Sequence, residues 1–289
     1  MISDITLGQF FPGTSVIHRL DPRTKIILTV MFIVAVFMAS NPAAFLLLLL
    51  TTAIVIAISG ISFSVILKGV KPIIVILIFT IILNVFLTGG EGDPLVSFWI
   101  IKIYTEGIVK AVFMALRVLI LIIGTSTFLT YTTSPISLTD GIESLLSPLK
   151  VIKVPVHTFA MMMTIALRFI PTLVEETEKI MNAQKSRGAD FSSGGLIKRA
   201  KALIPILIPL FVSAFKRAEE LATAMECRCY RGDKNRTKLV KLSYRGRDAV
   251  FFLLSAVFLA AVILMRFVGG WLPEWFSGMT VVKIMLYVI

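Results

Sequence analysis

The uncharged stretch IILTVMFIVAVFMASNPAAFLLLLLTTAIVIAIS, residues 26–59, decides the fold of this chain. It consists of two apolar runs, 26–40 and 43–59, which are separated by the turn residues Asn41 and Pro42. A helix of about 20 apolar residues, or about 17 at the short end, spans the hydrocarbon core of a bilayer. Because no charge interrupts the turn, we expect a helical hairpin whose two arms both cross a membrane.

The composition of the whole chain agrees with a membrane environment. Of the 289 residues, 57% are hydrophobic and 16% are charged, and the mean hydropathy is +0.92. Three further apolar runs approach the length of a span, at residues 72–88, 108–129 and 249–265. We therefore expect an all-α, polytopic membrane protein with about five transmembrane helices.

The distribution of charge predicts the orientation of these helices. Residues 134–247 hold 19 of the 29 Lys and Arg and 10 of the 17 Asp and Glu, which gives this stretch a net charge of +9. Basic segments are retained on the cytoplasmic side of the plasma membrane. Lys68 and Lys71 are expected to mark a return to the cytosol, and the loop with Glu91 and Asp93 to lie outside.

The first 20 residues lack the layout of a cleavable signal sequence, so we expect the N-terminus to stay cytoplasmic. The chain then divides into an N-terminal region of four spans (1–133), a cytoplasmic region (134–247), and a C-terminal span with a tail at the outer interface (248–289). Trp99, Trp271 and Trp275 are expected to anchor the outer interface, where tryptophan is enriched.

Two apolar stretches within the cytoplasmic region, 154–174 and 203–215, are interrupted by proline or arginine and run directly into charged sequence. We expect long amphipathic helices there rather than spans. In the second helix the apolar residues recur at helical spacing opposite Lys216, Glu219 and Glu220. This stripe comprises Leu203, Leu207, Leu210, Phe211, Ala214, Ala218, Leu221, Ala222 and Met225.

The two amphipathic helices repeat one pattern. Glu178, Ile180, Ala183 and Arg187 in the first have the same spacing as Glu219, Leu221, Ala224 and Arg228 in the second. Each helix therefore presents one arginine near its end, where a planar guanidinium can bind a carboxylate of another protein through two hydrogen bonds. A solvated surface charge is the simpler alternative for either arginine taken alone.

Short motifs along most of the chain resemble those of one known family, the transmembrane T-component of energy-coupling factor transporters. They occur in the order and spacing typical of that family. The matching residues are His18-Arg19-Leu20-Asp21-Pro22-Arg23-Thr24-Lys25, Thr132-Thr133-Ser134-Pro135, Leu138-Thr139-Asp140, Leu146-Ser147-Pro148-Leu149, Arg168-Phe169-Ile170-Pro171, Ala183-Gln184 and residues 224–232.

The resemblance implies a role in vitamin or metal-ion import. The family carries two Ala-Arg-Gly signatures on its coupling helices, and the corresponding residues here are Ser186-Arg187-Gly188 and Cys227-Arg228-Cys229. Each signature is implied to bind one of two cytosolic ABC ATPase subunits. Because position 229 lacks glycine, we expect the second helix to continue towards Arg231 and Gly232.

A third partner is implied as well, a membrane-embedded substrate-capture (S) subunit. A long apolar stripe is poorly suited to water, so our hypothesis is that part of the stripe on the second helix contacts this subunit. The residues are Leu210, Ala214, Ala218 and Leu221. The chain is expected to have no cofactor.

Two other functions compete with coupling. A self-contained secondary transporter needs intramembrane polar groups, and the spans offer few beyond Asn84, Lys110 and Arg117. An intramembrane enzyme needs a cluster of titratable groups at one depth, which we do not find.

The chain also lacks a Gly-rich phosphate loop, so we expect no ATP hydrolysis and no enzyme activity. The basic region lacks an aromatic platform for nucleic acid.

Several residues keep two interpretations. Cys227 and Cys229 fall short of the four ligands of a zinc site, because both histidines lie far away in sequence. Arg117, inside a predicted span, is either functional or a cap for carbonyls of a neighbouring helix. Residues 161–163 are three methionines, suited to a partner surface or to core packing. His157 is expected to be a hydrogen-bonded helix residue.

Overall fold

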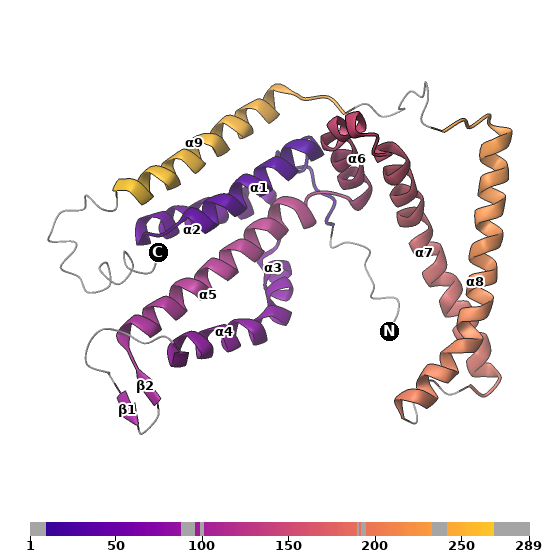
Figure 1. Ribbon diagram of the computed structural model, residues 1–289, viewed down its shortest axis with the longest axis horizontal. Helices are drawn as coiled ribbons and strands as arrows, with labels where there is room; N and C mark the ends of the chain where they lie inside the picture. The colour runs from indigo at the N-terminus through magenta and orange to yellow at the C-terminus, as the bar shows by residue number, and fades with distance from the viewer. Residues whose placement is uncertain are drawn as a thin grey trace. The chain divides into compact units, whose positions relative to one another are not determined.

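The computed structural model describes residues 10–87, 96–98, 101–189, 191, 195–232 and 242–268. The chain forms two compact units (Figure 1). Of the described residues, the larger unit comprises those in 10–134 and 242–268, and the smaller unit comprises those in 135–232. The predicted outer-interface residues Glu91, Asp93, Trp99, Trp271 and Trp275 lie outside the described residues.

Helices dominate both units, which confirms the all-α prediction. The larger unit contains α1 (Pro22–Met38), α2 (Pro42–Ser59), α3 (Phe63–Val70), the short 3-10 helix η1 (Lys71–Ile73), α4 (Ile74–Leu87), α5 (Thr105–Thr125), the π-helical turn η2 (Ser126–Thr130) and α9 (Gly246–Val268). The sequence did not predict one small feature between α4 and α5. Strands β1 (Val96–Phe98) and β2 (Ile101–Ile103) pair antiparallel there, with Val96 opposite Ile103.

Five helical segments in the described part of the chain are long and apolar enough to cross a membrane. They are Pro42–Ser59, Phe63–Phe86, Gly107–Thr130, Val156–Ser186 and Gly246–Phe267. The number agrees with the prediction, but one member differs. The helix α1, with 17 residues, is not among these five. Val156–Ser186, which we expected to be only amphipathic, qualifies by length and composition because its charges gather in its second half.

The predicted hairpin of residues 26–59 is present. Pro42 occupies the first turn of α2, where its missing N–H costs nothing, and Asn41 is the N-cap residue. The amide of Asn41 donates to the carbonyl of Met265 in α9 (2.6 Å), and Nη2 of Arg117 in α5 donates to the carbonyl of Ala39 (2.8 Å). Arg117 thus caps the end of α1, which supports the structural interpretation of this residue.

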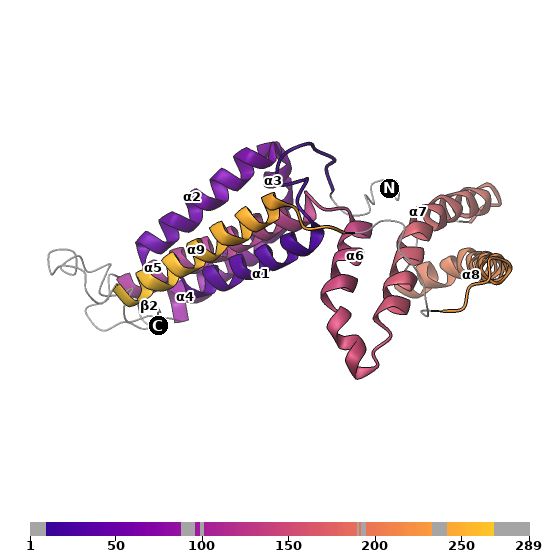
Figure 2. The same ribbon diagram turned by 90° about the horizontal axis from the view of Figure 1, so that it is seen from above.

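The core of the larger unit lies between α1, α2, α5 and α9, which Figure 2 shows running alongside one another. It is built from large apolar side chains, and a glycine in α5 allows α1 to approach closely. Phe32 of α1 packs against Phe128 of η2 with 5.8 Å between ring centroids, and the same ring lies directly over Gly124 of α5. Fully buried members of the core include Ala35, Val36, Leu48, Ile120 and Val262.

The third span begins earlier than the sequence suggested. Gly60, with φ of +68°, ends α2 in the left-handed conformation that glycine adopts without strain, and α3 begins at Phe63. Lys68 lies in the last turn of α3 and Lys71 in η1, and their marking a return to the cytosol stays a prediction. Figure 1 shows α3 bending into α4, and Pro72 in η1 explains the bend because proline interrupts the backbone ladder.

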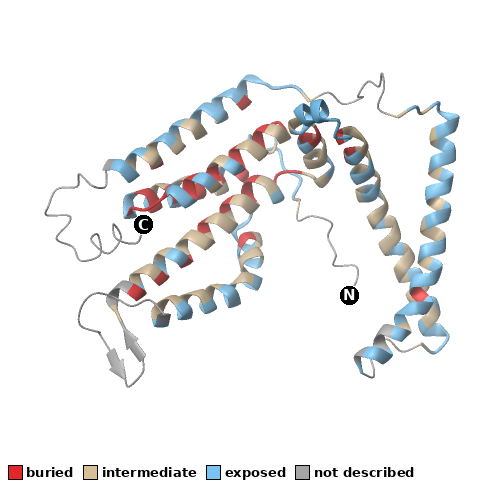
Figure 3. Cartoon of the chain, viewed as in Figure 1, coloured by how far each residue is buried: buried red, intermediate tan, exposed pale blue. Residues whose placement is uncertain are grey.

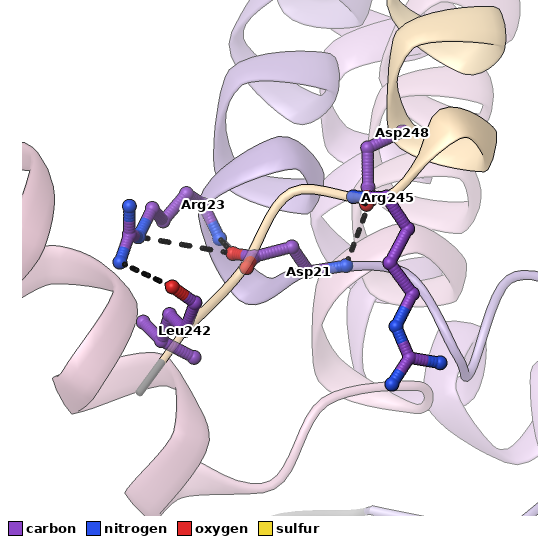
Figure 4. A network of polar contacts seen from close by, with 5 residues as sticks. All are labelled: Asp21, Arg23, Leu242, Arg245 and Asp248. Carbon is purple, nitrogen blue, oxygen red and sulfur yellow. Dashed lines mark hydrogen bonds and ion pairs between the residues drawn. The ribbon is translucent and has the colours of Figure 1, made fainter. Parts of the chain in front are cut away.

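The starts of α1 and α9 are joined by a polar network (Figure 4). Asp248 is buried, and its two oxygens accept hydrogen bonds from the backbone N–H groups of Asp21 (2.9 Å) and Arg245 (2.8 Å). Asp21 is in turn the N-cap of α1 and accepts from the N–H of Arg23. The ammonium group of Lys25 donates to the carbonyl of Thr132 at 2.7 Å. These bonds give much of the N-terminal motif a structural role.

The smaller unit contains α6 (Pro135–Leu145), η3 (Ser147–Ile152), α7 (Val156–Ser186) and α8 (Leu196–Cys227). Nδ1 of His157 in α7 forms a 2.8 Å hydrogen bond with the buried carboxyl group of Glu143 in α6. This contact confirms the prediction for His157. It also fixes the start of α7, the first of the two amphipathic helices.

Candidate functional site: the arginine-bearing ends of α7 and α8

The candidate site is carried by two helices that form a hairpin. The helix α7 has 31 residues and α8 has 32, and a short connection joins them. Figure 1 shows that the two helices run in opposite directions and cross. Where they cross, Nη2 of Arg217 in α8 lies 2.7 Å from Oε2 of Glu176 in α7. The sequence analysis did not single out this ion pair, although Glu176 and Arg217 are offset by the same 41 positions as Arg187 and Arg228.

The end of α7 has the geometry of a Schellman motif. Arg187 is the C-cap residue, Gly188 follows with φ of +88°, and the N–H groups of Gly188 and Ala189 donate to the carbonyls of Lys185 and Gln184. This confirms that Gly188 terminates the helix. The last carbonyls are satisfied by the turn itself, so the side chain of Arg187 is not needed to cap them.

The end of α8 is built in the same way, with cysteine in the place of glycine. Arg228 is the C-cap residue, Cys229 follows with φ of +58°, and the N–H groups of Cys229 and Tyr230 donate to the carbonyls of Glu226 and Met225. Our expectation that α8 continues past Arg228 is therefore wrong. Hydrogen bonding within the turn outweighs the cost of a left-handed non-glycine residue, which is about 1–2 kcal/mol.

The two arginines consequently have almost the same backbone conformation. Their φ and ψ angles are −87° and 6° for Arg187, and −88° and 14° for Arg228. Both residues are exposed, and neither guanidinium has a hydrogen bond or ion pair with any residue that the structure describes. The flanking residues Ser186, Gly188, Cys227 and Cys229 are small and exposed as well, so a protein surface can approach each guanidinium closely.

The hairpin separates the two arginines. Each lies 11 residues beyond the crossing ion pair, which corresponds to a helical arm of about 16 Å. Because the helices run in opposite directions, the arms point away from the crossing to opposite ends of the hairpin. Pro171, Pro205 and Pro209 all precede the ion pair in their helices, so neither arm contains a helix-breaking residue. Each arginine thus stands at the end of its own straight arm.

The apolar surface of α8 differs in part from the stripe that we singled out. Leu210, Ala214 and Leu221 are half-buried, because the hairpin packs this side of α8 towards α7, and Ala218 is exposed. Figure 3 shows that much of the remaining surface of α8 is exposed. The exposed apolar residues line a shallow groove of about 620 Å³ edged by Lys216 and Glu219. We call these residues the α8 apolar face: Leu207, Ile208, Phe211, Val212 and Phe215.

The two cysteines and the three consecutive methionines are the remaining candidates from the sequence. Cys227 and Cys229 are free, exposed thiols, and the described residues contain no group of three side chains suited to a metal ion. Met161 is half-buried, whereas Met162 and Met163 are 54% and 39% exposed, so these methionines face both the protein and its surroundings.

Comparison with known proteins identifies close relatives over nearly the whole chain. A family model for CbiQ, described as a cobalt transport protein, matches residues 13–239. The energy-coupling factor transporter transmembrane protein EcfT of Ruminiclostridium cellulolyticum is 54% identical over 268 residues, which cover 93% of this chain and 99% of that protein. The EcfT proteins of Clostridium kluyveri and Bacillus subtilis are 52% and 50% identical, and the matches cover 93% and 91% of this chain and 100% and 98% of those proteins.

Proposed function

The chain belongs to the CbiQ family and is a transmembrane component of an energy-coupling factor transporter, and from that premise we propose that it transmits the motion of two cytosolic ABC ATPase subunits to a substrate-capture (S) subunit. In this proposal residues 134–247 form the coupling region on the cytosolic side of the plasma membrane, and the N-terminus is cytosolic. The imported substrate is a vitamin or another micronutrient, and the S subunit determines which one. The chain itself needs no cofactor.

One observation carries the proposal more than any other, namely the matching ends of α7 and α8. Two exposed arginines with the same cap geometry, at opposite ends of one hairpin, are suited to two copies of one binding pocket. A carboxylate in each pocket would accept two parallel hydrogen bonds from the guanidinium. Movement of the two pockets relative to each other would then act on the crossing of α7 and α8.

The binding residues in this proposal are Arg187 with Ser186 and Gly188, and Arg228 with Cys227 and Cys229. Replacing either arginine with alanine should weaken binding of the ATPases about a hundredfold or more. Loss of one partner from a desolvated pair costs about 3–5 kcal/mol, and 1.4 kcal/mol corresponds to a tenfold change in affinity. Lysine should restore little, because its ammonium group cannot make the planar double contact.

The measurement is a pull-down of the ATPase subunits by detergent-solubilised variants. The matched control is the double variant Lys185→Ala with Arg231→Ala, which removes two exposed cations near the same helix ends but leaves both cap residues in place. This control should bind normally. If the variant with both Arg187→Ala and Arg228→Ala also binds normally, the arginines are ordinary solvated charges and the proposed docking is wrong.

The S subunit is proposed to contact the apolar side of α8. Of the four residues that the sequence suggested, Ala218 is exposed and remains part of the proposed contact, whereas Leu210, Ala214 and Leu221 support it from beneath. The α8 apolar face extends this surface towards the start of the helix. Its stacked rings Phe211 and Phe215, with centroids 6.2 Å apart, offer a large apolar contact.

Polar substitutions on the α8 apolar face should affect binding of the S subunit but not binding of the ATPases. The double variant Phe211→Gln with Phe215→Gln should lose the S subunit while the ATPases stay bound, because the rings lie far along α8 from Arg228. The control is Glu220→Gln, an exposed residue of the same helix outside the groove. Co-purification of all three partners with the double variant would show that the α8 apolar face does not hold the S subunit.

A further inference from the structure

A second groove lies on the larger unit, between the N-terminal halves of α1 and α9. Its volume is about 450 Å³, and it is lined by Thr24 and Ile27 from α1 and by Tyr244, Arg245, Asp248, Ala249, Phe252, Leu253 and Ala256 from α9 and the segment before it. Nearly all of this lining is apolar. The small side chains of Ala249 and Ala256 leave room that a larger residue would fill.

The groove runs from a polar mouth to an apolar interior. Its mouth is formed by Tyr244, Arg245 and Asp248, at the end where both helices begin. From Asp248 to Ala256 the helix rises about 12 Å, and the exposed neighbours along this stretch are apolar, such as Leu253 at 69%. A ligand that fits the whole groove therefore has a polar head and an apolar chain.

Among the described residues, the mouth presents one cation without a partner, Arg245. The carboxylate of Asp248 is almost completely buried and accepts two backbone hydrogen bonds, so it is already satisfied within the protein. Arg23 is occupied too, since it contacts Asp21 at 3.9 Å, the carbonyl of Leu242 at 3.5 Å and the ring of Tyr244. The guanidinium of Arg245, by contrast, is exposed and has no partner among the described residues, and Figure 4 shows it directed away from Asp248.

Helix stability does not explain this cation. The N-terminus of a helix carries a partial positive charge and favours acidic residues, so an arginine immediately before α9 is unfavourable. The capping role of Arg245 is performed by its backbone N–H, which any residue except proline could supply. Its side chain is therefore available to bind an anion.

We propose that the groove between α1 and α9 binds one anionic glycerophospholipid. In this arrangement Arg245 contacts the phosphate, and the hydroxyl group of Tyr244 supplies a second donor. An acyl chain lies along Ile27, Phe252 and Ala256. A basic pocket between membrane helices is a general mode of lipid headgroup recognition, and the apolar interior favours a lipid over free phosphate. The bound lipid would reinforce the joined starts of α1 and α9.

The test uses the full-length protein in detergent, with native mass spectrometry of lipid binding. Phosphatidylglycerol and phosphatidylcholine with identical acyl chains are titrated separately, and inorganic phosphate is added as a competitor in a third series. Phosphatidylglycerol should bind more tightly. Arg245→Gln should weaken its binding about fivefold, the loss expected for one cation near a lipid surface, and Ala256→Phe should weaken both lipids by filling the groove.

The matched control is Arg266→Gln, which removes an exposed cation from the other end of the same helix. A photoreactive diazirine in the acyl chain gives the location, and wild type and Arg266→Gln should both be labelled on α1 and α9 beside the groove. Thermal unfolding of each variant shows whether it is folded. Equal binding of the two lipids, unchanged binding by Arg245→Gln, displacement by inorganic phosphate, or labelling elsewhere would each overturn the proposal.

Discussion

At residue 229 a cysteine adopts a backbone conformation that favours glycine, and this single residue shows how the two arginines come to match. With φ of +58°, Cys229 closes the same pair of hydrogen bonds at the end of α8 that Gly188 closes at the end of α7. The position of each arginine at the cap follows from that turn. The cap geometry is therefore shared even though the two signatures differ in sequence.

Exchanging these residues should change the local stability of the two helix ends in opposite directions. Cys229→Gly removes a backbone strain of about 1 kcal/mol at position 229. The backbone N–H groups at positions 229 and 230 should therefore exchange with solvent about fivefold more slowly. Gly188→Ala should accelerate exchange at Gly188 and Ala189, because a Cβ there is strained at φ of +88° even though it meets open space. Hydrogen–deuterium exchange measures both effects.

Binding of the ATPases should survive Cys229→Gly, which gives the end of α8 the same residue as the end of α7. If neither substitution alters amide exchange, the left-handed turns do not control the helix ends.

The repeated spacing in the sequence alone predicted that each arginine lies near the end of a helix. It could not predict the turn at Cys229, because a cysteine carries no signal for a positive φ.

At the scale of elements, uncharged spans were the easiest to predict and bends and faces were the hardest. Residues 26–59 contain no competing charge, so hydropathy and one Asn-Pro turn were sufficient for α1 and α2. The helix α3 was not predicted, because Lys68 and Lys71 led us to start the third span at residue 72. The side of α8 that faces solvent was assigned only in part, because helical periodicity gives a stripe but does not say which part of it α7 covers.

The packing of α1 against α5 depends on the absence of a side chain at Gly124. Gly124→Ala should lower stability by about 1–3 kcal/mol, because its Cβ would overlap the ring of Phe32, which is only 3% exposed and cannot move aside. For a chain of this size that corresponds to a fall in apparent Tm of several degrees, measured by thermal unfolding in detergent.

The control for this substitution is Gly246→Ala, at the start of α9, where an added Cβ meets no atom within 4 Å. It should leave Tm nearly unchanged. Adding Phe32→Leu to Gly124→Ala should recover part of the loss, since the smaller side chain makes room. A Gly124→Ala variant as stable as wild type would show that α1 and α5 do not approach as closely as described.

At the scale of the whole molecule, each of the two units has its own task in the proposed mechanism. The larger unit holds a tightly packed set of apolar helices. The hydrogen bond from the N–H of Asp21 to Asp248 joins the starts of α1 and α9, and the hydrogen bond from Arg117 to the carbonyl of Ala39 joins α5 to the turn between α1 and α2. The smaller unit carries the hairpin of α7 and α8 with an arginine on each arm. Among the described residues, neither unit contains a cluster of metal-binding side chains.

The gathering of basic residues in 134–247 favours a separate coupling region there, which stays a prediction. The opposite placement of Arg187 and Arg228 could not be predicted, because spacing along each helix does not reveal that the helices form an antiparallel pair. In the proposed mechanism, that placement lets each arginine bind a separate ATPase subunit. A self-contained carrier, the competing function, would not need it.

The most direct test of the central claim is substrate uptake into liposomes. The substrate is the molecule retained by the co-purified S subunit, identified by mass spectrometry, and uptake is measured for this chain alone and for the assembled complex. We expect ATP-dependent uptake only by the complex, and its loss in the complex that carries Arg187→Ala with Arg228→Ala. Accumulation of substrate by the chain alone, or full uptake with the double variant, would contradict the account.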